Sequence, residues 1–477
     1  IYNKKEESQI IEKLDLLNEY KFVLDKEQKK HVDKIITAFT REDEDDKTNI
    51  FIDASKTGTG KTFTTVSVAK KMGLQLFVVC PKCSIYNWIK FAEMVGIDIM
   101  IANYDMLKRG KCFMDPNTYE IEPKFAVKCE WVSRKGRKYF VKRTVGKSFL
   151  WNLPDKSLIV FDEIQSCKNT SSINFQLLKG AKKYIDSSFN SKMLVLSATL
   201  IEKRGETAIY LWLLDFIEYP TINSFNKFMR DWGYSFSDIH TLLFDSEVYF
   251  ASKMKLKINK KVTIDSKLFK GTEKDVQIIN KNYIKIKNAL DDMKTKKLSK
   301  QQSGQKLAEI IYARQEIEHV KSVTFAETIY NKYKEGKSVV LFVNFIGTLN
   351  SVLDILEEKG ITDREISFII GSGNEKRLRL PKLDKNYEMK RFNLGYTRIL
   401  LATIHSGSTS ISLHDTSIGG KRERYVLISP PWSAIKLKQA FGRTVRRGLT
   451  SNVTQDIVFI KHSIEEKIAS DLDRKLK

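Results

Sequence analysis

The sequence predicts an α/β protein with two parallel sheets, one in each half of the chain, from two observations. Short apolar runs alternate with helix-compatible segments from residue 49 to 200 and again from 338 to 460, as expected of parallel strands joined by helices. A glycine-rich turn directly follows the first apolar run, Asn49–Ala54. With 477 residues, 42% of them hydrophobic, the chain is long enough for about two to four domains.

The glycine-rich turn has the pattern of a phosphate-binding loop. Its residues are Ser55, Lys56, Thr57, Gly58, Thr59, Gly60, Lys61 and Thr62. Gly58 and Gly60 allow a tight turn in which backbone N–H groups converge on an anion. We expect Lys61 to reach the β- and γ-phosphates and the Thr62 hydroxyl to hold Mg²⁺. Ser55 stands where the usual pattern has glycine, and it is small enough to be tolerated. The loop therefore predicts ATP and Mg²⁺ as cofactors.

A second strand end carries acids. The apolar run Ser157–Phe161 ends in Asp162-Glu163-Ile164-Gln165, and the carboxyl ends of parallel strands face the ligand crevice of such sheets. Asp162 is expected to hold Mg²⁺, and Glu163 to orient and deprotonate the attacking water. Two acids at a strand end are common by themselves, but together with Lys61 they predict a nucleoside triphosphatase.

The second half has no phosphate loop and carries arginines instead. Its predicted strands are Ser338–Asn344, Ile366–Ile370, Arg398–Thr403, Tyr425–Ser429 and Ile457–Ile460. The segment Gln439–Gly448 contains Arg443, Arg446 and Arg447. Guanidinium groups suit a phosphoryl group during transfer, as an arginine finger does. Alone this motif would be a basic helix; with the phosphate loop it predicts the other wall of an ATP site.

Charge points to a polyanionic partner. Lys and Arg number 82 against 58 Asp and Glu, a net charge of +24, which favours nucleic acid over a membrane surface. No apolar run is long enough to predict a membrane span. The five cysteines are odd in number and scattered, which suits a reducing, intracellular compartment, nuclear or cytoplasmic. Cys80 and Cys83 lack further zinc ligands at the usual spacing and are interpreted as structural.

Two regions interrupt the α/β pattern. In residues 108–151, alternating segments Phe125–Trp131 and Tyr139–Val145 predict an inserted β-hairpin. Eight Lys or Arg against one acid lie between residues 128 and 147, so the hairpin is either simply solvated or a phosphate-contacting arm. Residues 205–330 are predicted to be helical and rich in Lys. Residues 1–40 are also predicted to be helical, and the amide of Gln28 could bind the adenine edge; an ordinary surface glutamine is the alternative.

Taken in order, these motifs resemble a superfamily 2 helicase or translocase, and more narrowly its Snf2-type branch, over residues 20–110 and 155–470. The superfamily-wide matches are Gln28, Ser55–Thr62, Asp162–Gln165, Ser197–Thr199 and Gln439–Arg446. The Snf2-like matches are Val79–Trp88, Ala102–Leu107, Asp162–Asn169, Val339–Leu356, Ser429–Trp432 and Ser463–Ile468.

The resemblance implies a P-loop fold of two tandem RecA-like lobes, with ATP in the cleft and nucleic acid across both lobes. The implied boundaries are an N-terminal segment 1–40, lobe 1 over 41–225 with the insertion 108–151, a helical Lys-rich insertion 226–335, and lobe 2 over 336–477. The resemblance also implies nucleotide contacts by Gln165 and Gln439. Nucleic-acid contacts are implied for Lys82, Tyr104, Thr199, Thr403 and Gly407.

Three departures from the Snf2 pattern refine this resemblance. Gln165 replaces the usual His, Ser197-Ala198-Thr199 has the helicase form, and Ser406–Leu413 is less glycine-rich. With the Lys-, Asn- and Ile-rich composition, they resemble helicases and nucleoside triphosphatases of large cytoplasmic DNA viruses. Three functions stay open: a Snf2-like translocase on duplex DNA, which we favour, a strand-separating DNA or RNA helicase, and a non-catalytic scaffold. A monomeric motor recruited to a transcription or replication assembly fits the first two.

Overall fold

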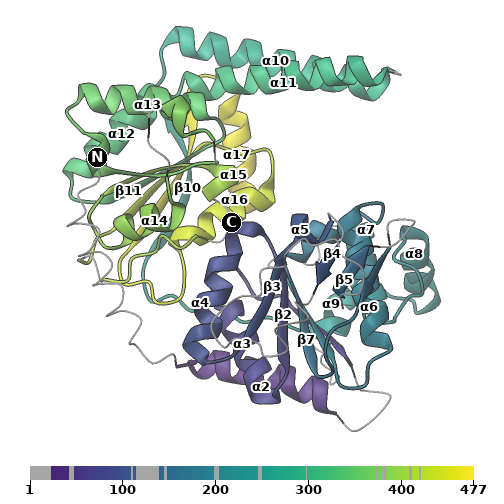
Figure 1. The fold of residues 1–477 in the computed structure, drawn as a ribbon. Coiled ribbons are helices and arrows are strands. Elements are labelled where there is room, and N and C mark those ends of the chain that lie inside the picture. Colours follow the sequence, from purple (N-terminus) through teal and green to yellow (C-terminus); the bar gives the residue numbers. More distant parts are fainter. Residues whose placement is uncertain are drawn as a thin grey trace. The chain divides into compact units, whose positions relative to one another are not determined.

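A computed structural model describes most of the chain as two compact units, residues 1–256 and 257–477. The described residues are 23–41, 48–108, 111–113, 139–143, 148–197, 204–244, 250–296, 298–371, 373–378, 380, 383–407, 411–417 and 420–476. Each unit contains one six-stranded sheet in which all strand pairs are parallel (Figure 1). The predicted fold class, two parallel α/β lobes in tandem, is confirmed.

The first unit is built on a sheet with the strand order β3-β2-β7-β8-β1-β9. Its described strands are β1 (Ile50–Asp53), β2 (Gln75–Cys80), β3 (Ile99–Asn103), β4 (Lys111–Phe113), β5 (Tyr139–Arg143), β6 (Phe149–Trp151), β7 (Ser157–Asp162), β8 (Lys192–Leu196) and β9 (Ala251–Ser252). Its helices are α2 (Lys26–Thr40), α3 (Lys61–Met72), η1 (Lys82–Ser84), α4 (Ile85–Val95), α5 (Tyr104–Lys108), η3 (Ile164–Cys167), α6 (Ile173–Asp186), α7 (Arg204–Leu213), α8 (Ile222–Asp231) and α9 (Phe236–Phe244).

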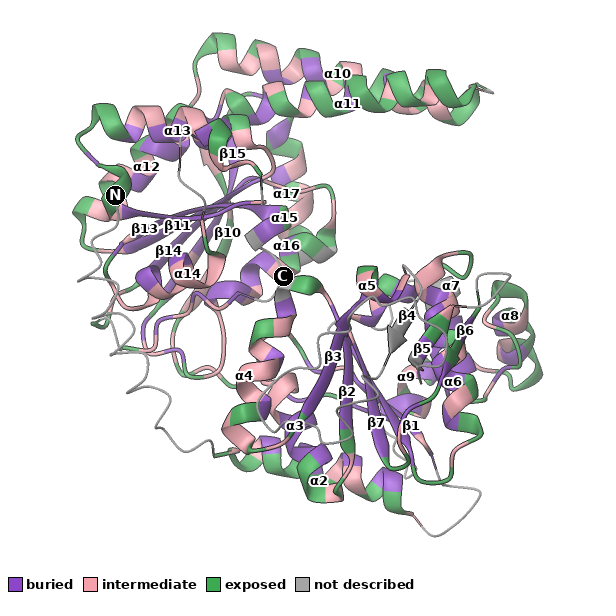
Figure 2. Ribbon diagram, viewed as in Figure 1, coloured by how far each residue is buried: buried purple, intermediate pink, exposed green. Residues whose placement is uncertain are grey.

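Helices cover both faces of this sheet, which explains why its strands are apolar runs rather than alternating ones. Successive side chains of a strand point to opposite faces. Along β2, Phe77 and Val79 enter one hydrophobic core, whereas Val78 and Cys80 enter the other, which they share with residues of α2, α3 and α4. Both sides of the strands are therefore buried (Figure 2), and the polar groups of the site can only gather at the strand ends.

The predicted insertion in the first unit contributes a small separate sheet. β5 pairs antiparallel with both β4 and β6, so the strand predicted over Tyr139–Val145 does pair, but the described partners are Lys111–Phe113 and Phe149–Trp151. The other predicted arm, Phe125–Trp131, and the basic turn lie outside the described residues. The predicted role of this hairpin therefore stays a prediction.

The second unit has the strand order β10-β15-β14-β11-β13-β12. Its strands are β10 (Val262–Phe269), β11 (Ser338–Val343), β12 (Ile366–Ile369), β13 (Ile399–Thr403), β14 (Arg424–Ile428) and β15 (Val453–Ile460). Its helices are α10 (Glu273–Thr295), α11 (Lys300–His319), α12 (Ser322–Lys334), α13 (Ile346–Glu358), η4 (Asp363–Glu365), η5 (Glu375–Leu378), α14 (Lys385–Asn393), α15 (Ile404–Gly407), α16 (Ala434–Thr444) and α17 (Glu465–Leu476).

The boundaries of the units differ from the predicted ones. The region 226–335, expected as a helical insertion between lobes, is divided: α8 and α9 belong to the first unit, and everything from residue 257 onward belongs to the second. Within that region β10 is a full strand of the second sheet and pairs with β15 from Val262 to Phe269. The sequence did not predict this strand because the strand is only partly buried. Its Lys-containing sequence therefore lacks the continuous apolar run of a buried strand.

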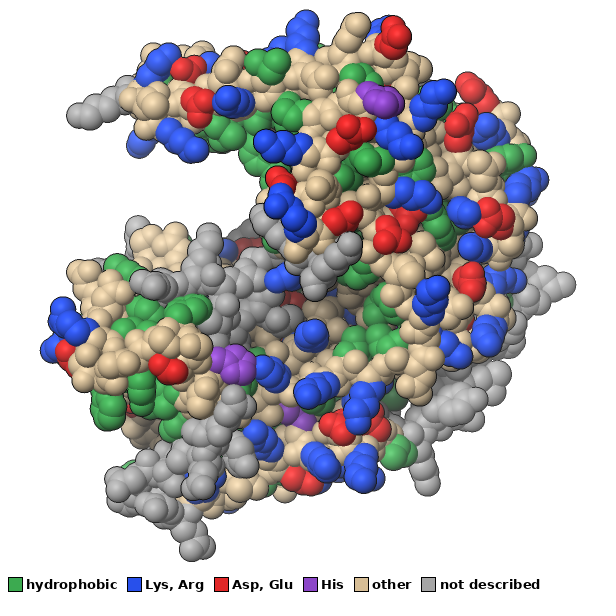
Figure 3. All heavy atoms as spheres, turned by 180° about the vertical axis from the view of Figure 1, so that it is seen from behind, with side chains coloured by type: hydrophobic (Ala, Val, Ile, Leu, Met, Phe, Trp, Pro, Cys, Tyr) green, Lys and Arg blue, Asp and Glu red, His purple; other side chains and the backbone are tan. Residues whose placement is uncertain are grey.

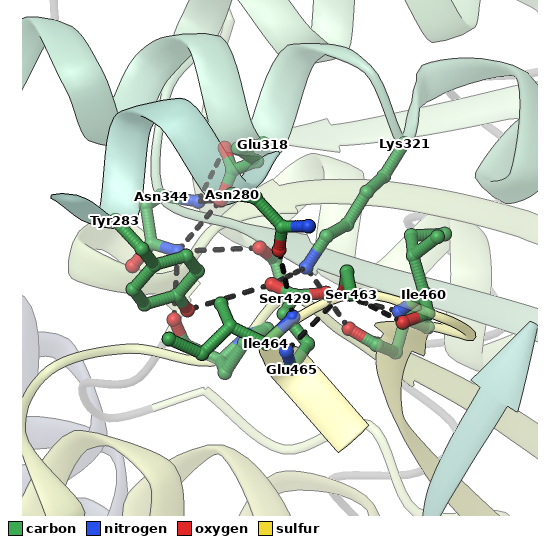
Figure 4. A network of polar contacts seen from close by, with 12 residues as sticks. Asn280, Tyr283, Glu318, Lys321, Asn344, Ser429, Ile460, Ser463, Ile464 and Glu465 are labelled. Carbon is green, nitrogen blue, oxygen red and sulfur yellow. Dashed lines mark hydrogen bonds and ion pairs between the residues drawn. The ribbon is translucent and has the colours of Figure 1, made fainter. Parts of the chain in front are cut away.

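The long helices α10 and α11 form a hairpin whose two arms lie side by side (Figure 1) and share a small apolar core that includes Ile279, Ile286 and Ile310. Polar groups join the hairpin to the start of α17 (Figure 4): Tyr283 donates to Glu465 at 3.5 Å, and Asn280 accepts the Ile464 N–H at 2.8 Å. A buried ion pair lies beside these contacts. The Lys321 ammonium lies 2.6 Å from the Glu465 carboxylate, and these side chains are 1% and 0% exposed. None of the helices in the described part of the chain is both long and apolar enough to cross a membrane.

Candidate active site

The phosphate loop follows β1 and ends at the start of α3. Gly58 and Gly60 have φ angles of +85° and +95°, which only glycine adopts without strain. Gly60 is also closely approached, because a Cβ atom there would collide with the Gln28 amide. The side chain of Thr59 is buried and donates to the Lys56 carbonyl at 2.8 Å. The loop is therefore held in a turn whose N–H groups precede a helix N-terminus, a geometry that suits a phosphate.

Lys61 and Ser55 complete the loop. The Lys61 ammonium donates to the Ser55 carbonyl at 2.7 Å and to the Lys56 carbonyl at 3.3 Å. Ser55, the residue that replaces glycine, is fully buried, and its hydroxyl accepts the Met254 N–H at 2.8 Å. The serine thus links the loop to the chain beyond β9. The sequence predicted only that a serine is small enough for this position, not that its hydroxyl makes a contact.

Beneath the loop lies a buried contact between His31 and Asp53 that the sequence interpretation missed. His31 Nε2 lies 3.1 Å from the Asp53 carboxylate, with exposed side-chain fractions of 3% and 0%. The other Asp53 oxygen accepts the Ser55 N–H at 2.9 Å. Burial acts to raise the pKa of Asp53, but the His31 charge and hydrogen bond, together with Lys61, outweigh it and lower the pKa. A possible signal was the helical spacing of Gln28 and His31, which places both on the face of α2 that meets the loop.

Gln28 also contacts the loop directly. Its Nε2 donates to the Thr59 carbonyl at 3.1 Å, and its Oε1 accepts the Asp25 N–H at 3.2 Å as part of a capping box at the start of α2. The structure therefore places the predicted adenine-side residue beside the phosphate loop. Its contact with adenine stays a prediction.

The acids lie at the carboxyl end of β7. Asp162 Oδ2 accepts the Trp88 indole N–H at 3.0 Å, and the Asp162 carbonyl accepts the Tyr104 hydroxyl at 2.8 Å. Burial and the neighbouring Glu163 carboxylate raise the pKa of Asp162 to about 6, although Trp88 and Lys61 act in the opposite direction. Lys61 and Asp162, about 100 residues apart in the chain, are thus brought within electrostatic reach of one another.

Glu163 adopts a backbone conformation that is rare for a residue with a side chain. Its φ and ψ angles are 57° and 54°, and such left-handed residues cost free energy and cluster at functional sites. Its carboxylate accepts a hydrogen bond from Gln165 Nε2. The Ser197 hydroxyl in turn donates to Gln165 Oε1 at 3.2 Å. Gln165 therefore links Glu163 to the end of β8, whereas its predicted contact with the nucleotide stays a prediction.

The residues present fit a magnesium ion. Thr62, at the start of α3, and Asp162 would supply a hydroxyl and a carboxylate, and Mg²⁺ prefers such oxygen ligands together with water and nucleotide phosphates. Burial and, second, the neighbouring Glu163 carboxylate raise the pKa of Asp162, and a divalent cation would relieve the repulsion between the two carboxylates. Among the described residues no cluster of three or more His, Cys, Asp or Glu side chains could hold a metal ion, so a protein-only metal cage is not what this part of the chain offers.

The arginine motif lies at the end of α16 in the second unit. Arg443 is 3% exposed, and Arg446 donates to the carbonyls of Ile411 and Gly442 at 2.6 and 3.1 Å. Burial and the Arg443 charge lower the pKa of Arg446 to about 9. A buried and a half-buried cation side by side favour an anion such as phosphate. Gln439 lies on the same helix and is half-buried.

The predicted nucleic-acid residues lie in different environments. Lys82 is exposed on η1, Gly407 ends α15, and Thr403 is buried at the end of β13. Tyr104 is only 6% exposed, and its hydroxyl donates to the Asp162 carbonyl. Thr199 lies outside the described residues. On the face in Figure 3, Lys and Arg side chains are widely spread with acids among them. These nucleic-acid contacts stay predictions.

Comparison with known proteins finds one substantial relative. No family model matches the chain. A protein of Acanthamoeba polyphaga mimivirus, called an ATP-dependent RNA helicase by name, is 27% identical over 500 residues, which cover 100% of this chain and 86% of the relative. The similarity bears out the recognised resemblance to helicases and to those of large DNA viruses.

Solved structures of two motors are also similar to the chain. The Sulfolobus solfataricus SWI2/SNF2 ATPase core in complex with double-stranded DNA has 18% identity and a TM-score of 0.33, covering 95% of this chain and 91% of that one. The Saccharomyces cerevisiae protein Dbp5, bound to RNA and ADP BeF3, has 11% identity and a TM-score of 0.44, covering 98% and 97%. Both TM-scores are low, so the fold assignment rests on the strand orders of the chain itself.

Proposed function

We propose that this protein is an ATP-dependent nucleic-acid motor of superfamily 2 type that hydrolyses ATP to ADP and phosphate. The observation that carries the proposal is a phosphate loop with Lys61, beside a strand end that carries Asp162 and Glu163. The strained backbone of Glu163 further supports a functional role for this strand end. A non-catalytic scaffold fits less well because it would have no use for this combination.

Each residue has a proposed role in hydrolysis. The loop N–H groups and Lys61 bind the phosphates, and Thr62 and Asp162 hold Mg²⁺, which when bound neutralises charge on the phosphate oxygens. Glu163 orients the attacking water and accepts its proton. Arg443 and Arg446 stabilise the charge of the transferring phosphoryl group.

Two candidate functions differ in the nucleic acid on which the motor acts. The Snf2-like motifs favour translocation on duplex DNA, and Tyr104, Thr403 and Gly407 are then proposed to act near the phosphate backbone. The name of the mimivirus relative favours RNA and strand separation instead. Contacts through the backbone make either form of binding largely independent of base sequence and weaker at high salt.

The test is the rate of ATP hydrolysis by the whole chain without nucleic acid and with single-stranded DNA, duplex DNA or RNA, each at low and moderate salt. Stimulation mainly by duplex DNA supports the translocase. Stimulation mainly by RNA or single strands, together with strand displacement, supports the helicase. Glu163→Gln is the control: it should lose about 10²–10⁴ of the rate and still bind nucleotide. Absence of hydrolysis under every condition would overturn the proposal.

A further inference from the structure

Asp162 is held by two side chains that have no part in the proposed hydrolysis of ATP. The strands β3, β2 and β7 are neighbours in the first sheet, so the segments that follow β2 and β3 start beside the end of β7. Trp88 comes from the segment after β2, and Tyr104 directly follows β3. Both reach Asp162, one at its carboxylate and one at its backbone carbonyl.

The bond from Trp88 is strongly determined by its surroundings. The Trp88 side chain is 1% exposed and is the largest of the fully buried side chains. An indole N–H is only a donor, and a buried donor without an acceptor costs free energy. Asp162 Oδ2 at 3.0 Å is the acceptor. Because the ring is buried in the core that α4 shares with α3 and the sheet, it fixes the position of this oxygen rather than following it.

Tyr104 determines the position of the same residue from the other side. Its hydroxyl donates to the Asp162 carbonyl at 2.8 Å, and its ring lies 6.5 Å from that of Phe161, the residue before Asp162. The carboxylate and the backbone of Asp162 are thus fixed separately.

We propose that Trp88 and Tyr104 are positioning residues that orient the Asp162 carboxylate for Mg²⁺, an inference that rests on the proposed ATPase function. Groups that hydrogen-bond to metal ligands orient them, and their loss typically weakens metal binding or activity by about 10–100-fold. Neither residue touches the nucleotide in this role. Trp88 acts on the carboxylate itself, so its loss has the larger effect.

The chain offers a matched control for each variant. Trp151 is buried in the same unit and donates its indole N–H to the Leu177 carbonyl at 3.2 Å. Tyr184 donates its hydroxyl to the Leu153 carbonyl at 3.1 Å. Trp151→Phe and Tyr184→Phe therefore remove the same groups as Trp88→Phe and Tyr104→Phe, but these groups donate to carbonyls other than that of Asp162.

The experiment measures how the melting temperature of the whole chain, with saturating ADP, rises with Mg²⁺ concentration, and how ATP hydrolysis depends on Mg²⁺. For Trp88→Phe we expect the Mg²⁺ concentration at half-effect to rise by about tenfold or more, and for Tyr104→Phe a smaller rise. The two control variants should keep the wild-type value. A general loss of packing would lower the melting temperature without nucleotide and leave this half-effect concentration unchanged.

Two outcomes would overturn the inference in distinguishable ways. If the wild-type chain responds to ADP and Mg²⁺ but Trp88→Phe and Tyr104→Phe respond as their controls do, the positioning role is wrong and the proposed function stands. If the wild-type chain shows no stabilisation by nucleotide and Mg²⁺, the proposed function itself fails. Tyr104→Phe removes one oxygen atom only, so the test holds even where Trp88→Phe folds poorly.

Discussion

Glu318 and Glu465 in the second unit and Asp162 in the first unit have different electrostatic surroundings. In the second unit, Glu318 accepts the N–H groups of Asn344 and Phe345 and the Thr348 hydroxyl at 2.8–3.0 Å, and Glu465 binds Lys321 and the Ile460 N–H. Each carboxylate therefore has its partners within the unit (Figure 4). In the first unit Asp162 lies beside Glu163, a group of the same charge, and its pKa is raised by burial and by this neighbour.

The difference is the one expected between a structural site and the proposed catalytic site. A buried carboxylate whose acceptor capacity is used by the chain stabilises a particular packing. A pair of like charges is unfavourable until a ligand of opposite charge arrives. Arg443 and Arg446 in the second unit form the corresponding pair of cations, and the lowered pKa of Arg446 has the same origin in burial and like charge. In the proposed function, the acid pair binds Mg²⁺ and the arginine pair binds the transferring phosphate.

The arginine pair is expected to show the largest effect. Arg446→Gln removes the charge but keeps a side chain that can donate to the Ile411 carbonyl. If Arg446 stabilises the transferring phosphoryl group, the rate of ATP hydrolysis falls by about 10³–10⁵, with nucleotide affinity changed far less. Single-turnover hydrolysis measures the loss. If the rate falls by less than tenfold, Arg446 has a structural role and does not stabilise the phosphoryl group.

The buried pair of Glu465 and Lys321 is expected to affect stability rather than catalysis. Glu465→Gln leaves Lys321 buried without its counter-charge, and breaking such a pair costs about 3–5 kcal/mol in the unfolding free energy of the second unit, measured by urea titration. Glu335→Gln is the control, because its ion pair with Lys332 has the same 2.6 Å length but side chains that are 25% and 44% exposed; a surface pair contributes about 0–1 kcal/mol. Equal losses in the two variants would contradict the comparison.

The smallest expected effect is a dependence of stability on pH that comes from His414. His414 lies near the arginine pair, and burial, Arg446 and Arg424 lower its pKa to about 4. Between this value and the unfolded value, the unfolded chain binds a proton that the folded chain does not, so stability falls as the pH is lowered from about 6.5 to about 4. The expected slope is at most about 1.4 kcal/mol per pH unit. In His414→Asn the unfolding free energy should depend less on pH between about 4 and 6.5. An unchanged slope would show that the pH dependence comes from another residue.

The local order of residues determined much of this protein. Buried parallel strands must be continuous apolar runs, and a phosphate loop needs glycine at certain positions, so β1, β2, β7 and the loop were predicted close to where they lie. The identities of Lys61, Asp162 and Glu163 followed from the same local patterns. The strand β10 was missed because its half-buried, Lys-containing sequence carries no such pattern.

Only the tertiary structure decided which distant residues meet. The Trp88–Asp162 bond, the His31–Asp53 pair and the Ser55–Met254 bond join positions far apart in the chain, and no periodicity encodes them. The burial of Tyr104 is of the same kind, because an aromatic residue after a strand can face solvent or the sheet. Local sequence sets backbone conformation through sterics and burial pattern, whereas hydrogen-bond partners depend on which strand ends the packed sheet places side by side.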